Sequence, residues 1–227
     1  MVLAVALGSG SAGLGDLFTP GSRAYRIVVA YRLPRVLLGA VSGAGLAAAG
    51  AALQSVLRNP LADPHILGVA GGAALGATVA IAAGAGAGSL LASASVPFAS
   101  FAGGALATLL IASIGRAART GGSAILLAGV VLNSIAYACI LFVEAFADPG
   151  KLQSLVWWLM GYIDAPTWSQ LALTAISAAV GIAILLADAA RINVLALGDE
   201  PAASLGIEVR SLERRALFAC AIVVGAV

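Results

Sequence analysis

The chain has 227 residues, of which 61% are hydrophobic and only 10% are charged, whereas a soluble domain carries about 25% charged residues. This composition cannot cover the surface of a water-soluble protein, so it indicates an integral membrane protein. Twelve Lys and Arg against ten Asp and Glu leave a formal charge of +2. Such a near-neutral balance argues against a nucleic-acid partner, because phosphate binding needs clustered cations.

Long stretches with few charged residues predict the membrane spans. A spanning helix needs about 20 mainly apolar residues. The stretches that are long enough cover approximately residues 34–57, 65–86, 96–115, 124–146 and 167–187. Two of these spans share one uncharged stretch, and the Gly, Ser and Pro residues from Gly84 to Pro97 place a break between them. The sequence therefore predicts an all-α integral membrane protein, a polytopic helical bundle.

Two shorter apolar segments, Met1–Gly8 and Ala216–Val227, flank the five spans. The first is too short to span, and it lacks the basic leader and clean cleavage site of a signal peptide. The second stops without a polar flank. We therefore expect residues 1–227 to form a single transmembrane domain that is truncated at both ends.

The distribution of Lys and Arg predicts the orientation, because cytoplasmic loops carry an excess of both. The loops of one side hold Arg58, Arg116, Arg119, Arg191, Arg210, Arg214 and Arg215. The other side holds Lys151 and a cluster of Arg23, Arg26, Arg32 and Arg35. We place the first side in the cytoplasm and expect the opposing cluster to have a separate use.

Small residues at four-residue spacing predict close helix packing. Gly68, Gly72 and Gly76 form one such row, and Gly39 with Gly43 and Gly84 with Gly88 form shorter ones. For any single pair, the glycine-rich composition is an equally good explanation. The three-glycine row is less easily accidental.

Polar residues within spans are candidates for a translocation path, and Gln54, Asn133 and Ser134 are the ones found. A buried amide that simply binds a neighbouring helix is the alternative for each. No charged residue lies at the centre of a span, and no metal motif or phosphate-binding loop occurs. Cys139 and Cys220 stand alone in apolar stretches and are expected to be packing residues. We expect no catalytic site, metal or cofactor, so any uphill transport needs a partner's energy.

The segment between the last two spans predicts a short rigid element. Asp199 can cap a helix that has Glu200 and Pro201 in its first turn, and Gly206 can end that helix in a left-handed conformation. Ser211 is then expected to begin the next helix. An ordinary solvated loop would leave four apolar residues uncovered, namely Leu195, Leu197, Leu205 and Ile207.

Three stretches together resemble one family, the FecCD-type permeases of bacterial ABC importers for iron siderophores, haem and vitamin B12. The stretches are Arg32-Leu-Pro-Arg35 with Gly39–Gly50 and Gln54; Arg58-Asn-Pro-Leu-Ala-Asp-Pro64 with Ile66–Ala73; and Leu195–Gly206. Weaker support comes from Leu126–Val130 and Trp157–Gly161. The resemblance runs over essentially the whole chain.

This resemblance implies a bacterial inner-membrane permease of about ten spans, of which the chain is a fragment running from the late first to the start of the seventh span. It also implies several partners: a second permease subunit, expected to be an identical copy, two ATPase subunits that use ATP, and a periplasmic or lipid-anchored substrate-binding protein.

The resemblance assigns roles to matching positions. Arg32 and Arg35 correspond to arginines that dock the binding protein, and Pro34 is expected to hold Leu33 extended between them. The cytoplasmic gate corresponds to Asn59 and Leu61, and Pro60 is expected to fix their turn. The ATPase-coupling helix corresponds to Leu197, Gly198, Asp199, Glu200, Leu205 and Gly206. Pro201 departs from the family pattern, and the glycine-rich Gly121–Ser123 loop leaves the gate contacts there undefined.

Two other classes remain as alternatives. An ion-coupled secondary transporter needs a titratable residue deep in a span, and the sequence shows none. A membrane scaffold without transport activity explains the glycines and the short helix without ATPase coupling. Siderophore, haem and cobalamin permeases share these motifs, so the sequence does not distinguish the substrate.

Overall fold

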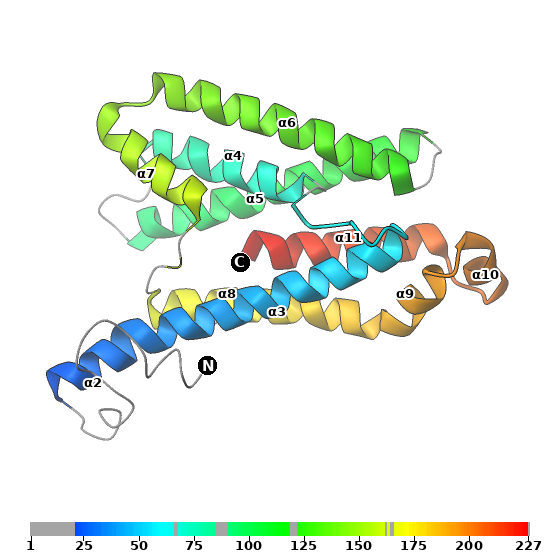
Figure 1. Cartoon of the computed structure of the whole chain (residues 1–227), viewed down its shortest axis with the longest axis horizontal. Helices are drawn as coiled ribbons and strands as arrows, with labels where there is room; N and C mark the ends of the chain where they lie inside the picture. Colours follow the sequence, from blue (N-terminus) through cyan, green and yellow to red (C-terminus); the bar gives the residue numbers. More distant parts are fainter. Residues whose placement is uncertain are drawn as a thin grey trace.

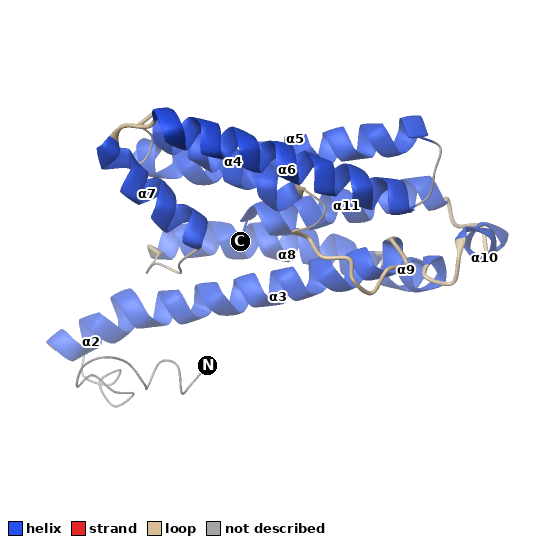
Figure 2. Cartoon of the chain, turned by 45° about the horizontal axis from the view of Figure 1, so that its top comes forward, coloured by secondary structure: helices blue, strands red, loops and turns tan. Residues whose placement is uncertain are grey.

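The computed structural model describes residues 21–65, 68–84, 90–118, 122–161, 163 and 166–226. The expected apolar segment Met1–Gly8 and the side-chain contacts of Gly121–Ser123 lie outside the described residues. Regular structure in the described part is entirely helical, which confirms the predicted all-α class (Figures 1 and 2). The helices are α2 (Arg23–Ile27), η2 (Val28–Arg32), α3 (Leu33–Val56), α4 (Val69–Ala82), α5 (Leu90–Ala118), α6 (Gly122–Phe146), α7 (Pro149–Met160), α8 (Trp168–Ala187), α9 (Ala189–Leu195), α10 (Asp199–Ser204) and α11 (Val209–Ala226).

The long helices form two packed groups that α11 joins. One group contains α4, α5 and α6, and the other contains α3 and α8, while α11 packs against α3, α5 and α8. In Figure 1, α9 and α10 lie at one end of the bundle and α2 and α7 at the other. We call the end that carries α9, α10 and the turn after α3 the coupling end. Its core holds Leu53, Val56, Leu185, Leu195, Ala202 and Leu212.

Among the described residues, three helical stretches are long and apolar enough to cross a membrane: Arg23–Val56, Leu127–Phe146 and Trp168–Ala187. Helix α5 has 29 residues, whereas α4 has only 14, or about 21 Å at 1.5 Å per residue. The helical pattern agrees with the spans expected near 34–57, 124–146 and 167–187. The expected span at 65–86 is the one that differs most.

The chain enters α4 by a re-entrant path. From the end of α3 it runs back along the bundle before α4 begins (Figure 1). Gly68 caps α4 with a left-handed φ of +74°, and a Cβ placed on it would lie 3.0 Å from the carbonyl oxygen of Gly129. Gly129 is seven residues into α6, about 10 Å from its start. Helix α4 therefore begins at Val69, later than the expected start near residue 65, because the chain first packs Gly68 against α6.

The expected extended geometry at Leu33 is also wrong. Leu33 is helical, with φ −63° and ψ −49°, and helix runs continuously from Arg23 to Val56. The five residues before it form the π-helical turn η2, and the amide of Leu33 donates to the carbonyl of Val28. This wider turn accommodates the ring of Pro34, which would clash with the preceding turn of a regular α-helix.

The glycine row packs α4 closely against α5, as predicted. A Cβ on Gly72 would lie 2.6 Å from the Cβ of Ala107, and Gly76 would collide with the carbonyl of Ala99. Gly103 of α5 meets both glycines in return. The pair on α3 does not behave in this way, because a Cβ on Gly43 would meet nothing within 4 Å.

Two further differences concern the loops. Helix α5 begins at Leu90 and contains Pro97, so the break before it is shorter than the expected Gly84–Pro97. Helix α7 was not predicted; it begins after Asp148 with Pro149 in its first turn, a position that suits proline because no helical amide bond is lost there.

Candidate functional site: the coupling segment and the gate turn

A short bent segment, residues 188–207, lies at the coupling end, and we call it the coupling segment. Asp188 ends α8, α9 follows at once, and Gly198 turns the chain into α10 with a φ of +133°. Gly206 then ends α10 with a φ of +78°. The amide of Ile207 donates to the carbonyl of Ala202 at 3.0 Å, which closes the expected left-handed helix end.

Two boundaries of this segment differ from the prediction. The capping residue of α10 is Gly198, and Asp199 is the first helical residue with no side-chain capping bond. Asp199 therefore lies one position too late to cap α10, and its carboxylate binds Arg58. The following helix begins at Val209, two residues before Ser211, because the carbonyl of Glu208 already accepts from the amides of Ser211 and Leu212.

Apolar residues of the segment fall into two sets. Leu195 and Ala202 are fully buried and fix the segment to the core of the coupling end. Leu197 precedes α10 and is 75% exposed, and Leu205 follows α10 and is 70% exposed. The segment is thus held rigidly on one side and presents large apolar side chains on the other.

The turn after α3 has a defined geometry. The amide of Asn59 donates to the carbonyl of Gln54 and that of Arg58 to Ser55, which is the hydrogen-bond pattern of a left-handed helix end. Arg58 occupies the left-handed position with a φ of +49°. Asn59 Oδ1 then accepts from the amide of Leu61 at 2.9 Å. Leu61 is 78% exposed. We call residues 59–61, with Pro60 at their centre, the gate turn.

Arg58 joins the gate turn to α10. Its guanidinium forms an ion pair with the carboxylate of Asp199, 141 residues away. Glu213 of α11 lies beside this pair. Burial raises the pKa of Glu213 above its ordinary value of 4.5, and Asp199 raises it further, while Arg58 and Arg210 act in the opposite direction. Sequence reasoning missed these contacts, because opposite charges so far apart along the chain carry no local signal.

A buried carboxylate fastens the start of the segment. Asp188 is 2% exposed. Arg191 Nη1 donates to its Oδ1 at 3.2 Å, and Arg215 Nη2 lies 3.0 Å from its Oδ2, close enough for an ion pair but not aligned for a hydrogen bond. This cluster links the junction of α8 and α9 to α11. The sequence offered one indication of this cluster, because Asp188 and Arg191 are three residues apart and can therefore pair along a helix.

The three expected path residues do not form one site. Gln54 is exposed on α3, whereas Asn133 and Ser134 lie on α6. Asn133 packs on Gly71 of α4, and its Oδ1 is buried without a hydrogen-bond partner. Ser134 Oγ donates to the carbonyl of Val130 at 3.0 Å. Their role in a path remains a prediction.

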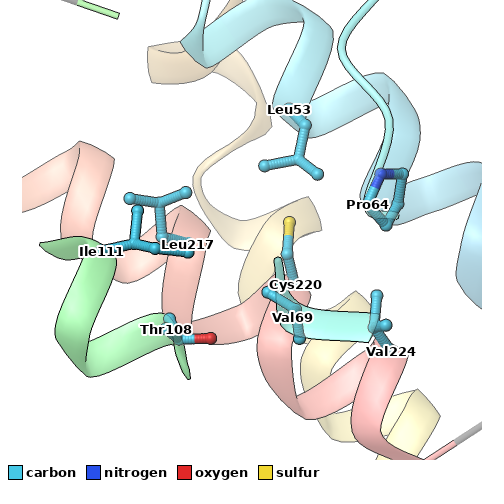
Figure 3. Close-up of a pocket in the computed structure, with 8 residues that line it drawn as sticks. All are labelled: Leu53, Pro64, Val69, Thr108, Ile111, Leu217, Cys220 and Val224. Carbon is cyan, nitrogen blue, oxygen red and sulfur yellow. The ribbon is translucent and has the colours of Figure 1, made fainter. Parts of the chain in front are cut away.

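Gln54, Asn133 and Ser134 do not line either of two hollows in the described part of the chain. A cavity of about 10 Å³ lies where the re-entrant chain meets α3, α5 and α11, and its apolar lining includes Pro64, Val69 and Cys220 (Figure 3). It has room for about one water molecule. A shallow hollow of about 470 Å³ lies between the ends of α4 and α6, lined by Phe142, Phe146 and Asp148 among others.

The predicted docking arginines lie at the end opposite the coupling end. Arg32 ends η2 and Arg35 lies in the first turn of α3. Arg35 Nε donates to the carbonyl of Ile163, in the connection between α7 and α8. In the described part of the chain, no group of three or more His, Cys, Asp or Glu residues could hold a metal ion.

Comparison with known proteins supplies the family. A model of the FecCD transport family matches residues 1–227. The hemin transport system permease protein HmuU of Yersinia pestis is 35% identical over 236 residues, which cover 100% of this chain and 70% of HmuU. The chain belongs to the FecCD transport family.

Other members are similar at the same level. The cobalamin import system permease protein BtuC of Halobacterium salinarum is 36% identical, with 88% of this chain and 53% of BtuC covered. The Fe(3+)-citrate import system permease protein YfmE of Bacillus subtilis is 32% identical, with 88% and 61% covered. The chain thus spans between about half and 70% of the length of these relatives.

A solved structure agrees with the fold. It is described as an inward-facing conformation of a metal-chelate type ABC transporter, and it is similar with a TM-score of 0.84 and 28% identity over 99% of this chain and 70% of that chain. The FecCD match includes both the gate turn and the coupling segment. Family membership and the apolar helices together identify a multi-pass membrane transport protein, in agreement with the expectation that the chain is not an enzyme.

Proposed function

We propose that this chain belongs to the permease subunit of an ABC importer that carries an iron chelate, haem or cobalamin across the bacterial inner membrane. The names of its relatives cover these three substrate classes. A separate pair of ATPase subunits supplies the energy, and a second copy of the permease completes the membrane pore. ATP binds to the partner subunits and not to this chain.

The coupling segment is the proposed contact with the ATPase. Leu197 and Leu205 enter an apolar groove of that subunit, and Gly198, Asp199, Glu200 and Gly206 shape the short helix between them. Because Leu195 and Ala202 are fully buried, motion of the groove moves α10 and the core of the coupling end together. The exposed leucines on a rigidly held segment are the observation that carries this proposal.

The gate and the path follow from this motion. Asn59, Pro60 and Leu61 close the cytoplasmic end of the path in the resting state, and displacement of α10 opens it. Gln54, Asn133 and Ser134 contribute mild polar groups to a wide path. No bond of the substrate is broken. Because a wide path makes few specific contacts with a bulky substrate, selectivity rests with the binding protein.

Docking of that binding protein is assigned to Arg32 and Arg35. Arginine binds a carboxylate through two parallel hydrogen bonds, and the bond from Arg35 to the carbonyl of Ile163 orients its side chain. A periplasmic or lipid-anchored binding protein with surface carboxylates fits this pair. Anchoring of the helix at lipid headgroups is the competing role for these arginines.

Reconstitution tests the proposed function. The full-length permease is placed in proteoliposomes with its ATPase and binding protein, and uptake of a ferric siderophore, haem and cobalamin is measured separately. We expect ATP-dependent uptake of one of the three, and none with an ATPase that cannot hydrolyse ATP. Uptake that follows an ion gradient without ATP would instead establish a secondary transporter, and absence of all uptake would favour a scaffold.

A further inference from the structure

One ion pair at the coupling end joins two parts of the chain that are 141 residues apart. Arg58, which supplies the guanidinium, directly precedes the gate turn. Asp199, which supplies the carboxylate, is the first residue of α10. Both side chains are accessible, with 38% and 60% of their surface exposed. The pair therefore connects the gate turn with the coupling helix itself and not only with the core beneath them.

The backbone of Arg58 is a second and independent observation. Its φ of +49° is the only positive value of a non-glycine residue in the described part of the chain. Glycine or asparagine normally occupies this position of a helix end, because a Cβ lies too close to the backbone in the left-handed conformation, glycine has none and asparagine offsets the cost with local hydrogen bonds. A strained residue that persists points to a use for its side chain, and here the side chain reaches Asp199.

Two carboxylates lie near Arg58. Asp199 is its ion-pair partner, and the pKa of Glu213 is raised by burial and by Asp199, while Arg58 and Arg210 act in the opposite direction. Arg210 lies on the same helix as Glu213. Arg58 lies in the turn after α3, whereas Asp199 is on α10 and Glu213 is on α11. Of the two arginines, Arg58 can therefore hold separate elements together.

We propose that Arg58 is a positioning residue that fastens the gate turn to the coupling helix, so that displacement of α10 by the ATPase is delivered directly to residues 59–61. This inference rests on the proposed function. A surface ion pair without mechanical consequence is the competing explanation, because many exposed pairs contribute nothing measurable.

Hydrogen exchange tests the link without any transport. Full-length permease in lipid nanodiscs is compared with Arg58→Asn and Asp199→Asn, which remove one charge each; asparagine tolerates the left-handed conformation. We expect amide exchange to accelerate about two- to fivefold in both segments 57–62 and 197–206 in either variant, the range that loss of an exposed ion pair allows. The charge swap Arg58→Asp with Asp199→Arg should restore slow exchange.

Arg214→Gln is the matched control. Arg214 is an exposed arginine of the same end whose Nε donates to the carbonyl of Arg210, so its variant should exchange like the wild type. The proposal is overturned if both neutral variants leave the partner segment unchanged, or if the swap exchanges as fast as the single variants.

Transport supplies the functional readout. In the complete importer, Arg58→Asn should raise the number of ATP molecules hydrolysed per substrate at least about twofold while ATPase affinity is unchanged, and Arg58→Lys should restore most of the coupling. An unchanged ratio overturns the positioning role. If the wild-type complex imports none of the three substrates, the proposed function fails, and hydrogen exchange still decides whether the link exists.

Discussion

Leu205 provides the sharpest test of ATPase coupling. Its side chain is 70% exposed, and its amide donates to the carbonyls of Pro201 and Ala202 at 3.3 and 3.2 Å. The backbone therefore holds this residue at the end of α10 whatever the side chain. Truncation in Leu205→Ala should leave the fold intact and remove apolar surface from the contact with the ATPase alone.

The exposed fraction sets the expected magnitude. Full burial of a leucine side chain stabilises by about 1.5–3 kcal/mol. Because roughly 70% of Leu205 is still accessible, docking can gain about 1–2 kcal/mol from it, and its loss should weaken ATPase binding about 5- to 30-fold. Leu205→Asp should weaken binding further, since a carboxylate must then lose its water in an apolar groove.

Affinity is measured by biolayer interferometry between the permease in nanodiscs and its soluble ATPase, and substrate-stimulated ATP hydrolysis is followed in parallel. Leu186→Ala is the control, because Leu186 is 69% exposed but lies near the end of α8, on a helix apolar enough to span the membrane. Its variant should bind normally. ATPase affinities within twofold of wild type for both Leu205 variants would refute the coupling assignment.

Three further predictions concern the gate, the helix packing and pH. Pro60→Ala should loosen the gate turn and speed the passive loss of loaded substrate from proteoliposomes without ATP; an unchanged leak would make the proline merely structural. Gly103→Val should lower the free energy of unfolding by about 1–3 kcal/mol in denaturant titrations, because its side chain collides with the backbone of α4, whereas Gly43→Ala should have little effect because a Cβ there meets nothing within 4 Å. The raised pKa of Glu213 means that its ionisation opposes folding: the stability it contributes is present below its ordinary pKa of 4.5 and is lost as pH rises through the raised value. Glu213→Gln should therefore raise the Tm at pH 7.5 and lose this advantage near pH 4.5; equal Tm values at both pH values would contradict the assignment.

The sequence by itself determined the helical class and most of the span positions. A bilayer accepts only helices long enough to satisfy their own backbone and apolar enough to face lipid, so uncharged stretches of about 20 residues leave little freedom. Local chemistry also determined the end of α10 at Gly206, because a glycine after the last helical turn adopts the left-handed conformation without strain. The Gly72 and Gly76 row predicted a close helix contact, although not which helix would supply Gly103.

Tertiary structure decided what local patterns leave open. Helix α4 starts at Val69 rather than near residue 65, because the chain re-enters the bundle and packs Gly68 beside α6 before the helix begins. Pro34 stays within a helix because the turn before it widens, which local preference does not predict. Asp199 lies inside α10 rather than at its cap, and its carboxylate pairs with Arg58, an opposite charge that only folding brings close. The link between the gate turn and the coupling helix therefore exists only in the folded chain, because it depends on a distance between residues that the sequence separates.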